Sequence, residues 1–103
     1  MSRTTFEAKL ATETAIETFD FTSRLAATET ISSASTTATV YSGTDASSSS
    51  VISGSATIAG QKITQKVTAG VEGVTYLLTC AITTSLGQTL NLSAFLPIVP
   101  AYA

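Results

Sequence analysis

Few residues in this chain have side chains that could act as nucleophiles, bases or metal ligands. The sequence has no histidine, one cysteine and five lysine or arginine residues. Cys80 would need a neighbouring base to become a nucleophile. A Ser–Lys pair would need an element that positions Lys62 or Lys66 beside a serine, and no motif in the sequence does so. We therefore expect no catalytic residue, and we expect Cys80 to be a small buried apolar side chain.

The acidic residues are too scattered to form a carboxylate pair or a metal site. Glycoside hydrolysis needs two facing carboxylates, and zinc or calcium needs clustered ligands. No glycine pattern fits a phosphate-binding loop. The sequence thus predicts neither a metal nor a cofactor. Most of the acids lie in the N-terminal stretch or in turns, where we expect them to be solvated: Glu7, Glu13, Glu17, Asp20, Glu29, Asp45 and Glu72.

The basic residues are equally scattered, at Arg3, Lys9, Arg24, Lys62 and Lys66. Nucleic-acid binding depends on clustered Lys and Arg that neutralise phosphates, so we expect no nucleic-acid partner and no anionic membrane surface. The N-terminus lacks the apolar segment of a signal peptide. No run of 18 apolar residues could form a membrane helix. We expect a soluble protein that is used without export.

The elements that must position these residues are strands. Threonine is abundant and suits strands, and serine suits turns. Turn signals such as "GTDASSSS", "AGQ", "AGVEG" and "SLGQ" separate six or seven short segments with period-2 patterning. We therefore predict an all-β fold, an antiparallel Ig-like β-sandwich of about seven strands. The main expected strands cover residues 18–25, 31–43, 55–58, 62–68, 74–83 and 89–96.

Alternation predicts which side chains face the core. In the segment 31–43 both registers contain apolar residues, so the inner face there is left open. Tyr76 follows a glycine-containing turn, where Ig-like sandwiches place a tyrosine corner. Pro97 and Pro100 are expected to end the pairing of the last strand. The expected inner positions are Ile63, Gln65, Val67, Val74, Tyr76, Leu78, Cys80, Ile82, Leu90, Leu92, Ala94 and Leu96.

No charged residue follows Glu72. The outer face of the last two strands is therefore Thr-rich and free of charge. Such a face cannot be a membrane span, and it is better explained if a neighbouring protein covers it.

Residues 1–17 differ in composition from the rest. We interpret them as an N-terminal arm that a partner orders, preceding a sandwich domain at 18–103. A frayed terminus is the alternative. If the arm hypothesis holds, deleting residues 1–17 should leave a folded sandwich that no longer binds its partner.

Three stretches together resemble the small Ig-like structural proteins of tailed bacteriophages. They are "FDFTSRLAATETISSAS", "VYSGTD" and "AGVEGVTYLLTCAITTSLGQTLNLSAFLPI". The G-x-x-Y-x-L-x-C-x-x-x-T-S-x-G pattern begins at Gly73 and ends at Gly87. In the first of these stretches Thr28 stands where that family often has glycine. This difference affects only the expected type of turn.

The resemblance implies a non-enzymatic virion structural protein, present in many symmetric copies and assembled in the host cytoplasm. Our first expectation is a capsid decoration or cement protein on the capsid surface that binds the major capsid protein and stabilises the head shell. The second is a head–tail connector or a tail or fibre component. The third, a carbohydrate-binding module, is disfavoured because tryptophan is absent.

The arm and the C-terminal end are the expected contacts with a partner. For Leu96 and Ile98 the alternative is an ordinary core position. The residues expected to bind a partner are Phe6, Leu10, Ile16, Leu96, Ile98, Val99 and Tyr102.

Overall fold

A computed structural model describes residues 4–6 and 8–99 of the chain, and the described part is all-β with two short 3-10 turns. The elements are β1 (Thr4–Thr5), β2 (Lys9–Leu10), β3 (Ala15–Asp20), η1 (Thr22–Arg24), β4 (Ile31–Ser42), η2 (Ser48–Val51), β5 (Ile52–Ala59), β6 (Lys62–Val67), β7 (Thr75–Thr84) and β8 (Thr89–Val99). Tyr102 and Pro100 lie outside the described residues.

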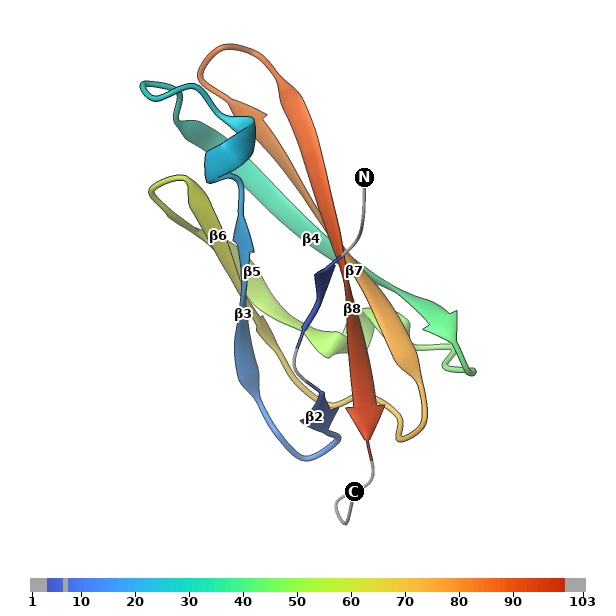
Figure 1. The fold of residues 1–103 in the computed structure, drawn as a ribbon. Coiled ribbons are helices and arrows are strands. Elements are labelled where there is room, and N and C mark those ends of the chain that lie inside the picture. Colours follow the sequence, from blue (N-terminus) through green and yellow to red (C-terminus); the bar gives the residue numbers. More distant parts are fainter. Residues whose placement is uncertain (1–3, 7, 100–103) are drawn as a thin grey trace.

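The strands form two sheets that pack face to face (Figure 1). The first sheet has the order β1-β8-β7-β4, with β2 also paired to β8. The second sheet has the order β3-β6-β5. These orders match strands C-F-G and B-E-D of an immunoglobulin sandwich. The predicted fold class is confirmed, although β1 and β2 pair with β8 in parallel whereas the other pairs are antiparallel.

The core lies between the sheets and has the side chains that alternation predicts. On β7, Tyr76, Leu78 and Cys80 are fully buried. Their partners on β8 are Leu96, Ala94 and Leu92. The second sheet contributes buried Ile63, Gln65 and Val67 from β6. β4 resolves the register that the sequence left open: Ala34, Ala38 and Val40 pack toward the core, and a register shift after Ile31 lets that residue face inward too.

Tyr76 closes the turn before β7 as a tyrosine corner. Its hydroxyl accepts a hydrogen bond from the Val71 N–H at 2.9 Å and donates one to Asp45 Oδ2 at 2.6 Å. Gly70 in the same turn has φ +100°, and a Cβ there would lie 2.9 Å from the Ile98 side chain. The turn can therefore pack against β8 only with glycine at this position. The loop after β4 is thus held to the start of β7.

Two sequence-based expectations about elements were wrong. The first strand was expected at 18–25, but β3 spans Ala15–Asp20 and the chain then forms η1. Pro97 does not end the pairing, because it lies opposite Thr75 within β8. The Ile98 N–H donates to the Val74 carbonyl, and the Ile98 carbonyl accepts from the Gly73 N–H, so both backbone groups of Ile98 face the β7 side. Because successive residues of a strand direct their backbone groups to alternate edges, the Pro97 nitrogen faces the other edge of β8. On that edge Pro97 lies between the residues that pair with β1 and those that pair with β2, where the missing N–H of proline breaks no hydrogen bond between strands.

Glu29 was expected to be solvated and is 2% exposed. Its carboxylate accepts hydrogen bonds from Thr84 Oγ1 at 2.5 Å and from the Ala26 N–H at 3.0 Å. Gln61 Nε2 donates to the Ala26 and Glu29 carbonyls at 3.0 and 2.9 Å. A buried carboxylate without hydrogen bonds would be costly, and here these bonds tie the loop before β4 to the end of β7 and to the β5–β6 turn.

Candidate interaction surfaces

The three long strands of the first sheet present an outer face of polar and apolar side chains, and Arg24 reaches β8 from η1, where its Nη1 donates to the Asn91 carbonyl at 3.5 Å. β4, β7 and β8 contain no Asp, Glu, Lys or Arg at any position. Most of the outward side chains carry hydroxyl groups, and the strand registers place them in adjacent rows. The polar outward residues are Ser33, Ser35, Thr37 and Thr39 on β4, Thr75, Thr79 and Thr83 on β7, and Thr89, Asn91 and Ser93 on β8.

An aromatic and aliphatic group interrupts these rows at one end of the face. The ring centroids of Tyr41 and Phe95 lie 4.5 Å apart, although β7 separates their strands. Leu77 lies directly opposite Phe95, and Pro97 lies opposite Thr75 in the same ladder. Tyr41 is 62% exposed. We call Tyr41, Leu77, Phe95 and Pro97 the Tyr41–Phe95 patch.

The outer face of the second sheet has a different character. Lys62 and Lys66 point outward from β6, and Asp20 points outward from β3 opposite Lys62. A hydrogen bond from Thr22 holds the pKa of Asp20 below its usual value. Ile16 is 65% exposed on this face, opposite Lys66. An isolated exposed isoleucine beside a lysine is ordinary protein surface.

The N-terminal segment lies along the free edge of β8 (Figure 1). β1 pairs with Ala94 and Phe95, and β2 pairs with Ile98 and Val99. Between them the Phe6 N–H donates to the Phe95 carbonyl at 2.8 Å. The Phe6 ring meets Phe19 edge-on, with centroids 5.3 Å apart. The segment therefore contributes a strand edge and one aromatic side chain to the domain itself.

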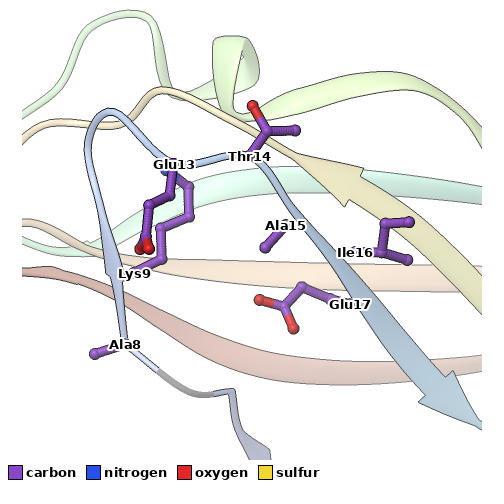
Figure 2. A pocket seen from close by; sticks show the side chains of 7 residues that line it. All are labelled: Ala8, Lys9, Glu13, Thr14, Ala15, Ile16 and Glu17. Carbon is purple, nitrogen blue, oxygen red and sulfur yellow. The ribbon is translucent and has the colours of Figure 1, made fainter.

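A hollow of about 330 Å³ lies where this segment turns back into β3 (Figure 2). It is lined by Ala8, Lys9 and residues 13–17. Lys9 is 3% exposed, and its Nζ donates to the Leu10 and Ala69 carbonyls at 2.8 and 2.6 Å. Burial lowers the pKa of Lys9, and Glu13 and Glu17 oppose that shift. Lys9 Nζ is thus bonded to the Ala69 carbonyl and Glu13 Oε1 to the Leu10 N–H, so both side chains hold the chain reversal between β2 and β3.

The residues expected to bind a partner fall into different environments. Leu96 and Ile98 are 0% and 2% exposed, so both are core side chains and neither is available to a partner in this conformation. Phe6, Leu10 and Val99 are half-buried along the β8 edge. Ile16 points outward from the second sheet, away from the others, and Figure 2 shows it leaving β3 on the side opposite Glu17. The structure therefore does not gather them into one surface.

The boundary placed at residue 17 falls inside β3, whose residues Ala15, Ile16 and Glu17 pair with Val67, Lys66 and Gln65. Deleting residues 1–17 would remove half of that strand together with β1 and β2. A loss of binding after this deletion would therefore result partly from the lower stability of the damaged sandwich. A deletion ending before Ala15 separates the two effects better.

Sequence reasoning missed the Tyr41–Phe95 patch and the roles of Glu29 and Asp45. Period-2 alternation places Leu77, Phe95 and Pro97 in the register opposite the core, so the sequence contained the signal for three of the four patch residues. Glu29 and Asp45 lie within two of the three stretches that carry the phage resemblance. The hydrogen bonds that fix those loops are the physical reason for these acids.

Cys80 is buried, and burial raises the pKa of its thiol to about 11. A protonated, enclosed thiol is a poor nucleophile. Within residues 4–6 and 8–99, no three His, Cys, Asp or Glu side chains gather into a possible metal site. No helix in the described part of the chain is long and apolar enough to cross a membrane.

Residues 9–97 match the model of a protein family described as "Podophage GP4 fiber-tail adaptor protein gp77". The match covers most of the chain, so this protein belongs to that family. No curated protein and no solved structure matches it. The chain is therefore a structural protein of a phage virion. The family description supports the expected tail or fibre component better than a capsid decoration protein, and it lends no support to the major capsid protein as partner or to a capsid-surface location.

Proposed function

We propose that this chain is a non-enzymatic adaptor that attaches a fibre to the tail of a podophage virion. The observation that carries the proposal is the family match over residues 9–97. An adaptor needs a rigid body with at least two contact surfaces. The sandwich is 45 Å long and has two outer faces of different chemistry, one without charge and one with Lys62, Lys66 and Asp20.

The charge-free face is the better candidate for a protein–protein contact within the virion. Charged residues are depleted in the centres of protein interfaces, whereas Tyr, Phe and Met are enriched. The Tyr41–Phe95 patch supplies the aromatic side chains, and the surrounding hydroxyl groups can donate or accept hydrogen bonds. Since few charges take part, we expect salt to weaken attachment only slightly.

The direct test is to image virions made without this chain. Electron microscopy of such particles should show complete heads and tails that lack fibres, and supplying the chain in trans should restore them. Fibres that remain attached would refute the adaptor role. Heads that lose stability while fibres stay in place, or copies of the chain arranged in a lattice on the shell, would instead support a capsid decoration protein.

A further inference from the structure

We propose that the charge-free outer face of β4, β7 and β8 binds the same face of a second copy of this chain, related by a two-fold axis. The inference deepens the proposed function and rests on it for its setting in the virion. The family description says nothing about what this surface binds.

The distribution of charged residues favours a second copy as the partner of this face. In a two-fold contact residue i faces residue j while residue j faces residue i, so a charge close to the axis meets its own copy on the partner. The chain carries a net charge of −2, yet β4, β7 and β8 carry none of its charged residues. The three strands that form this face therefore contribute no charged side chain to it, while Arg24 Nη1 donates to the Asn91 carbonyl of β8 at 3.5 Å.

The hydroxyl groups of the face also suit a second copy. Each Ser or Thr hydroxyl can both donate and accept, so a face covered with them is complementary to itself. The outer face of the second sheet lacks this property, because Lys62, Lys66 and Asp20 would each need a charged or strongly polar group opposite them. A charged partner on the first sheet would leave its own charges without counterparts, which is costly when they are buried.

The Tyr41–Phe95 patch can anchor the contact between the two copies. Tyr41 is 62% exposed, although its ring already contacts Phe95. Leu77 and Phe95 are half-buried beside it. Large exposed tyrosines next to half-buried apolar groups are typical interface anchors. When two sheets pack with their strands nearly aligned, Tyr41 of one copy can cover the patch of the other.

The size of the face sets the expected strength. The three strands have 10 to 12 residues. At about 3.4 Å per residue and about 4.8 Å between strands, the face covers roughly 500 Å² per copy. Stable interfaces bury about 800 Å² per partner. We therefore expect a weak, reversible dimer that multivalent attachment to a symmetric tail would strengthen.

The test is sedimentation equilibrium on the full chain from about 10 μM to about 1 mM, the range in which small interfaces associate. We expect a concentration-dependent dimer. Tyr41→Glu should weaken it about tenfold or more. Ile16→Glu is the matched control, because Ile16 is similarly exposed at 65% on the other sheet. A second pair, Thr37→Glu on β4 and Thr57→Glu on β5, compares a charge on each outer face without loss of an aromatic ring.

Amide NMR shifts during dilution should localise to β4, β7 and β8. A chain that stays monomeric to about 1 mM, at which even weak pairs associate, would overturn the inference. So would a dimer that Ile16→Glu or Thr57→Glu disrupts while Tyr41→Glu and Thr37→Glu do not. A failure of the adaptor role is seen separately, as fibres that persist on virions made without the chain, whatever the chain does in solution.

Discussion

The two sheets of this sandwich are alike where they face each other and unlike where they face outward. Their inner faces are both closely packed, with Leu78 and Ile63 each fully buried. The outer face of β4, β7 and β8 carries no charge, whereas the outer face of β3, β6 and β5 carries Asp20, Lys62 and Lys66. Folding requires both inner faces to be apolar, whereas the contact proposed above involves only one of the two outer faces.

The largest effects should come from the inner faces and should be the same on both sheets. We expect Leu78→Ala and Ile63→Ala each to lower the free energy of unfolding by about 2–5 kcal/mol, because each leaves a cavity in a packed core. Urea denaturation followed by circular dichroism measures both. A loss confined to one sheet would show that the two inner faces are not equivalent.

A smaller difference in stability should appear when the hydroxyl group is removed from each of two tyrosines that lie on opposite faces of the first sheet. Tyr76→Phe removes the bonds to the Val71 N–H and to Asp45, and should cost about 1–3 kcal/mol of unfolding free energy. Tyr41→Phe is the control, because Tyr41 is exposed on the outer face, and should change stability by less than about 0.5 kcal/mol. Equal effects in the same denaturation assay would argue against a structural role for the tyrosine corner.

Acidification should weaken the hydrogen bond between Tyr76 and Asp45 in the same tyrosine corner. The Tyr76 hydroxyl and then the Ser47 N–H hold the pKa of Asp45 below its usual value. The unfolded chain therefore binds this proton at a higher pH than the folded chain does. The stabilisation is complete above the unfolded pKa of about 3.9 and is lost as the pH falls through the lower folded value.

Denaturation midpoints measured between about pH 6 and pH 2.5 should fall on the acid side of this range. The fall should be shallower in Asp45→Asn. Asp20 contributes in the same direction through its bonds from Thr22, so Asp20→Asn serves as the comparison. An Asp45→Asn chain that loses stability as steeply as the native chain would contradict a special role for Asp45.

The smallest effects on stability should come from placing a charge on each outer face, and these same changes should differ most in their effect on fibre attachment. Thr37→Glu and Thr57→Glu each place a charge at an exposed strand position, and both should change the unfolding free energy by less than about 0.5 kcal/mol. On virions, however, we expect Thr37→Glu to reduce fibre occupancy and Thr57→Glu to leave it unchanged. Counting fibres in micrographs of complemented particles gives the answer, and equal occupancy would remove the proposed distinction between the faces.

Much of the fold follows from local patterns. The period-2 run from Val74 to Ile82 predicts the inner face of β7, and Gly60, with φ +66°, marks the β5–β6 turn where the sequence places it. Pro97 was misread because its effect depends on which edge of β8 needs a donor, and the sequence does not show that edge. Residues 1–17 were separated from the domain because strands of two residues have no detectable period.

The sequence alone determined the β-sandwich, the buried Cys80 and the lack of charge on the last two strands, because alternation and composition are local properties. The tertiary structure decided which loops Glu29 and Asp45 hold and that β1 and β2 lie on β8. It also brought Tyr41 and Phe95 together, although more than fifty residues separate them in the chain. These outcomes depend on strand pairing, packing and hydrogen bonds between segments that are far apart in the sequence, and such contacts exist only in the folded chain.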